Sequence, residues 1–244
     1  MYNTMYYNLV MINDIKIEIC LGNIQDVSVL NSYPIDRIEL NCALELGGMT
    51  PSLNTLVEAK KATDIPIMCM VRCRGGNFCY SKEEYEVMRK DAKMLLENGA
   101  DGIVFGFLNE DRTINIEESR KMVELIKSYN RQAVFHKAFD ETDDLEESTR
   151  ILIDLGIDRI LTSGRAVYPD ILEGCRRINA LQEKYGDKIE LLPGGGVRVE
   201  NIKDVITTAN THQVHMTSKK TYDGNYIGLD ETQLINLLDK VREI

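Results

Sequence analysis

The sequence predicts a single (β/α)8 barrel of the TIM type, and three observations support this fold class. Short β-prone runs alternate with amphipathic helical segments along the chain, which is typical of parallel βαβ units. Eight such runs occur within 244 residues, a length close to the ~250 residues of a typical barrel. The early runs also alternate polar and apolar residues. This favours a barrel with a polar interior over an open doubly wound sheet, whose covered strands are usually continuously apolar.

Local signals place the elements of the first half. The strands are expected at 15–21, 36–41, 66–72 and 101–107. The letters TPS at 50–52 predict a helix start at which Thr50 caps the first turn and the following proline tolerates the missing donor. A further helix is expected to begin at Ser81, with Glu84 completing a capping box.

The second half repeats the pattern without a linker rich in Ser, Gly or Pro. Its strands are expected at 133–139, 158–163, 188–196 and 213–218. A last helix closes the chain over roughly 230–243. We therefore expect one barrel domain over 13–244. Residues 1–12 are expected to be an N-terminal extension, because they lack the basic start and the small-residue cleavage site of a signal peptide.

Composition excludes some partners and compartments. The formal net charge of -10 disfavours a nucleic-acid binder and an anionic membrane surface as partners. No apolar run approaches the ~20 residues of a membrane span. Six cysteines without the spacing of a disulfide framework suit a reducing compartment, so we expect a cytoplasmic protein.

In such barrels the active face is built from the C-terminal ends of the strands and the loops that follow them. The chemically distinctive residues of this chain fall at those positions: Glu18, Cys20, Glu39, Cys42, Arg72, Cys73, Arg74, His136, Asp140, Gly194, Gly195, Gly196 and His215. Each has a structural alternative; the carboxylates, for example, could pair with Arg37 or Lys16 inside the barrel. Buried charges are costly unless paired or used, so their convergence on one face favours a functional site.

Two segments indicate an anion site. Gly194, Gly195 and Gly196 expose consecutive amides ahead of a helix expected near Val199, a combination that favours phosphate. The alternative is a tight turn that needs positive φ angles.

The segment RCRGG adds Arg72 and Arg74, which lie two apart and would face the same way in an extended chain. Both guanidiniums could then bind one phosphate or carboxylate. Alternatively, they neutralise Glu18 and Glu39.

Spacing alone does not define a metal site. Cu(I) requires two or three soft ligands, and the sequence has neither CxxC nor CxC. Cys20 and Cys42 end neighbouring strands and could approach each other, as could Cys73 and Cys79 across their glycine loop.

Six motifs occur in order along roughly 15–218: RIEL…GGMTPS, RCRGGNFCYS, GADGIVFGFL, FHKAFD, GIDRILTSG and PGGGV. Together they closely resemble the CutC copper homeostasis family. The resemblance implies a cytoplasmic (β/α)8 barrel that forms a homo-oligomer and binds Cu(I) through cysteines at the ends of the first two strands.

Residue by residue, the first of these cysteines matches Cys20, but the second falls on Asn41. Cys42 or Cys73 would then provide the second thiolate. The family's RPRGG is RCRGG here, and its FHRAFD arginine is Lys137.

Two functions follow. The resemblance predicts a copper homeostasis protein whose partner is a Cu(I) ion bound at the barrel mouth. The rival is an enzyme acting on a small phosphorylated or carboxylated metabolite, in which the arginines, the glycine loop and His215 bind the ligand. In that enzyme Glu18 or Glu39 and His136 would exchange protons and Asp140 would orient a partner.

Overall fold

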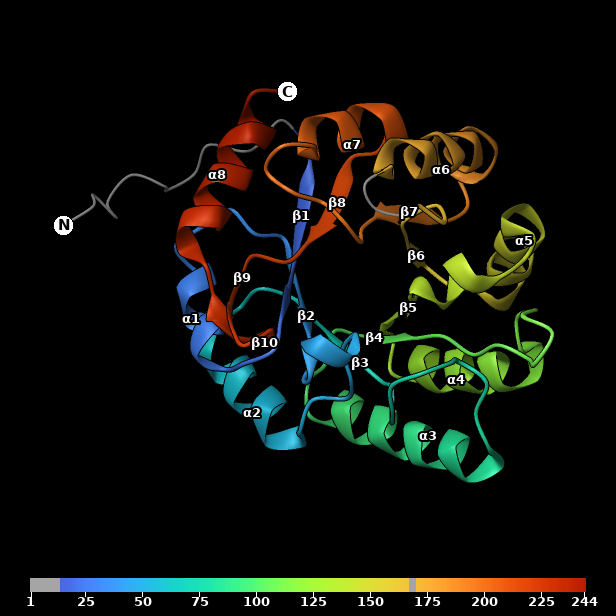
Figure 1. The fold of residues 1–244 in the computed structure, drawn as a ribbon. Helices are drawn as coiled ribbons and strands as arrows, with labels where there is room; N and C mark the ends of the chain where they lie inside the picture. The colour runs from blue at the N-terminus through green and yellow to red at the C-terminus, as the bar shows by residue number, and fades with distance from the viewer. Residues whose placement is uncertain (1–13, 167–169) are drawn as a thin grey trace.

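A computed structural model describes residues 14–166 and 170–244, and its elements form a barrel of parallel strands surrounded by helices (Figure 1). The barrel strands are β1 (Lys16–Leu21), β2 (Arg37–Leu40), β3 (Ile67–Met70), β4 (Gly102–Phe105), β5 (Gln132–Phe135), β6 (Arg159–Thr162), β7 (Glu190–Pro193) and β8 (Gln213–Met216). The helices are α1 (Gln25–Leu30), α2 (Leu53–Ala62), α3 (Lys82–Glu97), α4 (Ile116–Ser128), α5 (Leu145–Leu155), α6 (Ile171–Tyr185), α7 (Ile202–Ala209) and α8 (Glu231–Arg242). The predicted TIM-barrel fold is confirmed, whereas the predicted extension at 1–12 lies outside the described residues.

The strands follow the order β7-β6-β5-β4-β3-β2-β1-β8, so the first and last barrel strands are neighbours. Glu18 of β1 is in register with Arg37 of β2 and with His215 of β8. Between β7 and β8 no strand ladder forms within the described residues. Side chains bridge that seam instead, because Thr211 and Gln213 both donate to the carbonyl oxygen of Leu191 at 3.2 Å.

The predicted alternation separates a polar interior from an apolar shell. Ile17, Ile19 and Ile38 are completely buried beneath the helices, and Glu18 and Glu39 alternate with them on the inner face. The interior is polar only on one side, because a separate apolar cluster fills the β3–β5 side. Its members are Met68, Met70, Val104 and Val134.

Helix starts agree with the sequence at α3 and differ at α2. Ser81 and Glu84 form the expected capping box. At α2 the cap is Ser52, whose hydroxyl accepts the amide of Thr55, and Thr50 does not cap the helix. The hydroxyl of Thr50 is already engaged, because it accepts the Arg72 amide at 2.9 Å and thereby ties this loop to the end of β3.

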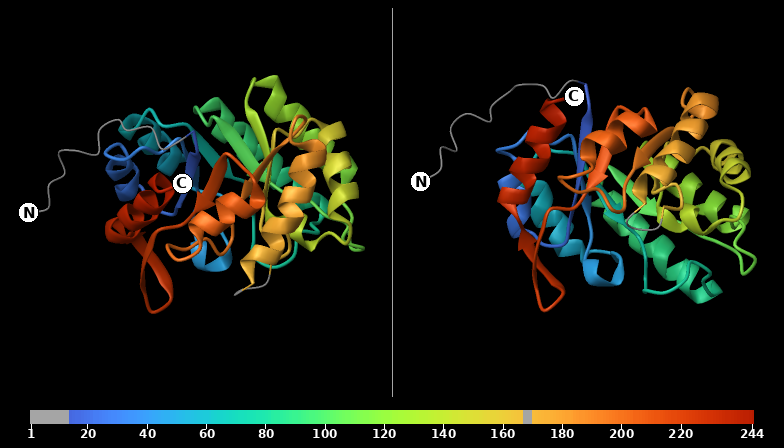
Figure 2. Two further views of the ribbon diagram at one scale, coloured as in Figure 1. Left: turned by 90° about the horizontal axis from the view of Figure 1, so that it is seen from above. Right: turned by 45° about the horizontal axis from the view of Figure 1, so that its top comes forward.

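A hairpin between β8 and α8 was not predicted. It consists of the antiparallel strands β9 (Lys219–Tyr222) and β10 (Asn225–Leu229) and projects from the barrel in both views of Figure 2. The Tyr226 hydroxyl donates to the Asp26 carboxylate, which anchors the hairpin to α1. The hairpin thereby brings its first residues over the barrel mouth.

Candidate functional site

A pocket of about 220 Å³ opens at the C-terminal ends of the strands. Of the residues predicted from the sequence, seven line it: Cys20, Glu39, Arg72, His136, Gly195, Gly196 and His215. Six of the predicted residues do not line it: Glu18, Cys42, Cys73, Arg74, Asp140 and Gly194. The pocket therefore lies on the predicted face of the barrel, and the residues that line it differ from the predicted set.

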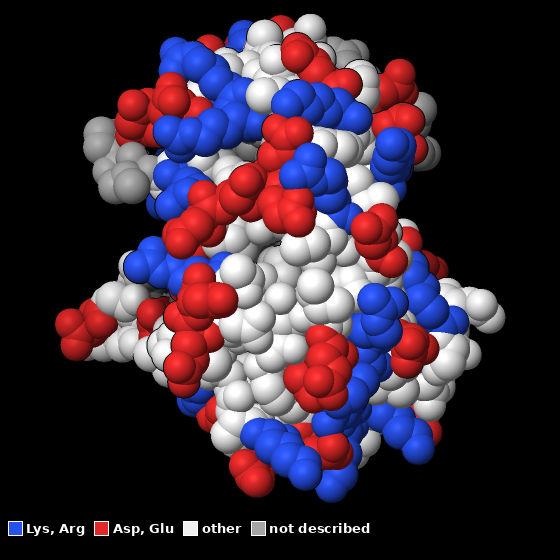
Figure 3. All heavy atoms as spheres, turned by 90° about the vertical axis from the view of Figure 1, so that its right-hand side faces the viewer, with Lys and Arg blue, Asp and Glu red and all other residues white. Residues whose placement is uncertain are grey.

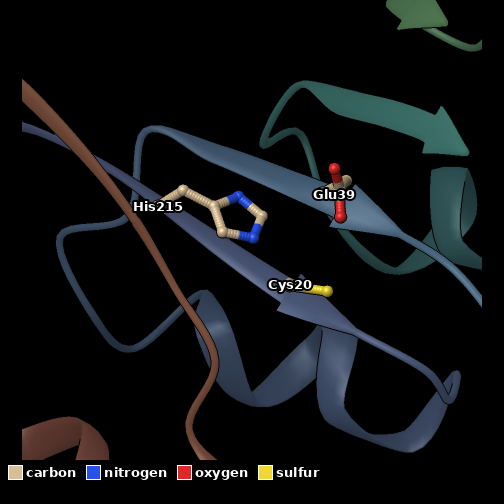
Figure 4. Close-up of side chains that lie close together, drawn as sticks. All are labelled: Cys20, Glu39 and His215. Carbon is tan, nitrogen blue, oxygen red and sulfur yellow. The ribbon is translucent and has the colours of Figure 1, made fainter. Parts of the chain in front are cut away.

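Three potential metal ligands converge at one side of the pocket. The Cys20 sulfur, a Glu39 carboxylate oxygen and a His215 ring nitrogen all lie within 4.8 Å of one another. Figure 4 shows the three side chains pointing toward a common point from β1, β2 and β8. Their convergence follows from the register, because Cys20 pairs with Glu39 and the neighbouring strand β8 brings in His215.

Glu18 orients this cluster from behind the pocket. One carboxylate oxygen lies 2.8 Å from His215 Nδ1, and the other accepts Arg37 Nε at 2.9 Å. Burial alone would raise the pKa of Glu18, but the hydrogen bond and charge of His215, together with Arg37, lower it to about 2. An ionised Glu18 holds the proton of His215 on Nδ1, which leaves Nε2 for a metal, as in carboxylate–histidine–metal arrangements.

Burial and charge set the protonation of the three cluster residues. Burial and the neighbouring Glu39 raise the pKa of the Cys20 thiol well above its usual value. Burial, reinforced by the Glu18 charge, also raises the pKa of Glu39. Burial opposes the charged form of His215, yet the charge of Glu39 and the bond to Glu18 raise its pKa. The metal-free cluster therefore holds its protons tightly.

Asn41 occupies the position at which the resemblance predicts a second cysteine. Its side-chain amide donates to Glu39 at 2.8 Å and contacts the Cys20 sulfur at 3.3 Å. Within the described part of the chain, one Glu39 oxygen and the Asn41 oxygen are buried without a hydrogen-bond partner. Asn41 therefore positions the cluster through its side-chain amide.

The other proposed thiolates lie elsewhere. The Cys42 thiol donates to the Thr50 carbonyl oxygen at 3.0 Å and belongs to no metal-ligand cluster among the described residues. Cys73 packs against the apolar core. The expectation that Cys42 or Cys73 completes a thiolate pair with Cys20 is not met, because the chain after each strand end carries the cysteine away from the pocket.

Arg72 and His136 also line the pocket. The Arg72 guanidinium donates to the carbonyl oxygens of Leu46 and Gly76, and its Nε has no partner among the described residues. His136 directly follows β5, and its Nε2 is likewise buried without a described partner. Both residues line the pocket, and each has one buried nitrogen without a described hydrogen-bond partner.

Arg74 and Asp140 serve other contacts. Arg74 binds Glu84 and stacks over Tyr80, with 4.8 Å between guanidinium and ring centre. It does not share the direction of Arg72, because the chain leaves the extended conformation after Met70. Asp140 accepts the amide and the hydroxyl of Ser163, and so holds the loop after β6.

The glycine loop lines the pocket only in part. Gly194 packs behind it, since a Cβ there would lie 3.0 Å from that of His215. Gly195 and Gly196 adopt positive φ angles of 83° and 101° and do line the pocket. The helix expected near Val199 begins only at Ile202, so its N-terminus is further along the chain than predicted.

Three basic residues of the pocket were not predicted as site residues: Lys137, Arg198 and Lys219. Lys137 follows His136 directly, and Arg198 follows the glycine run, so proximity to a predicted site could have identified both. Lys219 belongs to the unpredicted hairpin and offered no comparable signal.

The outer surface is of a different kind. Figure 3 shows positive and negative side chains interspersed over the side of the molecule at the right of Figure 1. Pairs such as Arg150–Glu147 and Lys184–Glu146 account for this pattern. None of the helices in the described part of the chain combines the length and apolarity that crossing a bilayer requires.

Comparison with known proteins shows the family to which the chain is similar. The model of the CutC family matches residues 15–220. The protein CutC of Treponema denticola is 42% identical over 207 residues, covering 85% of this chain and 82% of the relative. A copper homeostasis protein cutC homolog of Drosophila melanogaster is 36% identical over 225 residues, covering 91% of this chain and 84% of that protein.

Solved structures agree on the fold. The CutC crystal structure from Streptococcus agalactiae has a TM-score of 0.77 and 33% identity, covering 82% of this chain and 97% of that one. A phosphoribosyl anthranilate isomerase from Thermococcus kodakaraensis shares the barrel alone, with a TM-score of 0.60 and 18% identity over 94% of this chain and all of that one (100%).

Proposed function

Because the chain belongs to the CutC family, we propose that it is a copper homeostasis protein that binds Cu(I) through Cys20, Glu39 and His215. The observation that carries this proposal is the convergence of three ligand atoms within 4.8 Å at the barrel mouth. Copper is in this view the cargo of the protein.

The chemistry of the donors fits the ion. Thiolate and imidazole are ligands that copper favours, and the thioether-bearing residues Met70 and Met216 also line the pocket. The harder Glu39 carboxylate contributes negative charge. One of its oxygens has no hydrogen-bond partner among the described residues, so binding an ion there would break no hydrogen bond of that oxygen. Glu18 supports the site by fixing the ring of His215.

Compartment and assembly are further parts of the proposal. All six cysteines, each within the described residues, are free thiols, which supports a cytoplasmic location where thiols stay reduced. A homo-oligomer remains the prediction that family resemblance implies, and light scattering coupled to size-exclusion chromatography measures it directly.

An anaerobic competition titration of Cu(I) against a chromophoric chelator tests the site. We expect about one ion per chain and a loss of roughly 100-fold or more in affinity for Cys20→Ser, since even outer-shell changes cost 10–100-fold. Cys42→Ser and Cys73→Ser are matched controls and are expected to bind as the unsubstituted chain does. Equal affinities for Cys20→Ser and the unsubstituted chain would show that the site is assigned wrongly.

A second function is supported by Glu39, a buried carboxylate that lines the pocket. An enzyme acting on a small phosphorylated or carboxylated metabolite would use Glu39, whose pKa is raised by burial, to exchange a proton. Glu18 and Asp140 are engaged in ion-pair or loop contacts and are not assigned this step. Deuterium incorporation from solvent into a short-chain ketose phosphate, abolished by Glu39→Gln, tests the reaction.

A further inference from the structure

His136 is a pocket residue whose ring has an unsatisfied donor. Its Nδ1 accepts the amide of Ala138 at 3.1 Å. Burial and the charge of Arg72 lower the pKa of His136 to about 3, so the ring is neutral and its single proton lies on Nε2. That N–H is buried and has no acceptor among the described residues, and His136 is one of the residues that line the pocket.

Arg72 is a buried cation without a counter-ion. It is 6% exposed, and it interacts with carbonyl oxygens, the side chain of Tyr80 and the Phe78 ring, which lies 4.9 Å from the guanidinium. No carboxylate of the described residues lies within salt-bridge distance of it. An uncompensated buried charge is expensive, so an anion from outside the chain would relieve that cost.

Three further cations surround the pocket entrance: Lys137, Arg198 and Lys219. None of them forms a salt bridge within residues 14–166 and 170–244. Lys137 lies over the glycine loop, since a Cβ on Gly195 would come within 2.7 Å of its ammonium nitrogen. The amides of Gly195, Gly196 and Val197 also donate to no acceptor in these ranges.

Other residues of the pocket offer acceptors instead. One Glu39 oxygen and the Asn41 oxygen are buried and lack a donor among the described residues. The pocket is small, at about 220 Å³. A ligand that binds both the cationic donors and the acceptors is short, anionic at one end and hydroxylated at the other.

We propose that Arg72 and His136, with the entrance cations Lys137, Arg198 and Lys219, bind the phosphate or carboxylate group of a short hydroxylated organic anion. The hydroxyl end then reaches Glu39 and Asn41. This subsite would serve the enzyme considered above, but binding requires no turnover and no metal. It can therefore be tested separately from both proposed functions.

Calorimetric titration of chelator-treated, metal-free protein with glycerol 3-phosphate, glycerate and glycerol is the experiment. One site per chain is expected for at least one of the two anions, and the preferred anion identifies the group that is bound. Lys219→Met is expected to lower the affinity for that anion about tenfold, through loss of a charge-assisted contact. Lys220→Met is the matched control, because the neighbouring lysine lies on the same strand and does not line the pocket.

Two results would overturn the subsite: neither anion binding more tightly than glycerol, or equal weakening by Lys219→Met and Lys220→Met. Chelator treatment separates the proposals, since anion binding is then measured without copper. Anion binding without deuterium incorporation would support the subsite and count against the enzyme alone.

Discussion

At the scale of single residues, Glu18 determines what the site can bind. Its two oxygens hold Arg37 and His215 at the same time, and both contacts are buried. The ring of His215 is thereby fixed with one nitrogen engaged and the other left for a ligand. Glu18 is a positioning residue and does not belong to the cluster of possible metal ligands.

Copper affinity is expected to rise with pH. The pKa of the Cys20 thiol is raised by burial and Glu39, and that of His215 is raised by Glu39 and Glu18, so both protons must leave when the ion binds. Affinity measured by chelator competition between about pH 6 and about pH 8 should increase by up to about two decades per unit, one for each proton released. In Cys20→Ser, the increase in copper affinity per pH unit should be about one decade smaller. A pH-independent copper affinity of the unsubstituted chain would contradict the assignment.

Asn41→Cys is expected to tighten Cu(I) binding by about tenfold or more, because a second soft ligand replaces an amide that contacts the Cys20 sulfur at 3.3 Å. The same competition titration measures the gain. Asn41→Ser, which adds no thiol, is the control. If the two variants bind copper equally, position 41 does not face the ion.

At the scale of elements, the capping box of α3 is expected to contribute measurably to stability. Ser81 accepts the Glu84 amide, and Glu84 accepts the Ser81 amide in return. Ser81→Ala should lower the free energy of unfolding by about 1 kcal/mol, as measured by urea denaturation. Ser128→Ala, at the exposed end of α4, should change it by less than about 0.5 kcal/mol.

Whether an element could be predicted depended on the kind of sequence signal that marks it. Periodicity located the barrel strands, and local capping chemistry located the start of α3. The hairpin was missed although Asp223 and Gly224 carry the signal of a tight turn, and both have positive φ angles. Its strands β9 and β10 are short and mostly exposed, so they lack the apolar alternation that marks the barrel strands.

At the scale of the whole molecule, the buried polar network of β1, β2 and β8 is expected to hold the barrel together. Arg37 donates to Glu18 at 2.9 Å and to Gln213 at 2.7 Å. Arg37→Ala should lower the free energy of unfolding by about 3 kcal/mol, because a carboxylate loses one of its buried partners. Arg120→Ala, whose side chain is exposed on α4, is the control for thermal unfolding. A loss no larger than in this control would show that the network contributes little.

The set of residues that form the site could not be predicted from the sequence, because it depends on the arrangement of the whole barrel. Strand ends identified which residues face the mouth, but which of them meet depends on strand order and loop paths. His215 reaches Glu18 only because β8 lies beside β1, and Cys42 leaves the site because its loop turns toward Thr50. Neither the pairing of β8 with β1 nor the path of this loop is indicated by a pattern in the neighbouring sequence.

The pairing of β1 with β8 also has a consequence for biosynthesis. Glu18 and His215 are separated by 197 positions. At roughly 5–20 residues per second, a ribosome needs on the order of 10–40 s to cover that distance. During this interval the nascent chain carries a carboxylate whose final partner does not yet exist and a first strand with one edge open. Completion of the barrel, and with it the cluster of Cys20, Glu39 and His215, therefore waits for nearly the whole polypeptide to be translated.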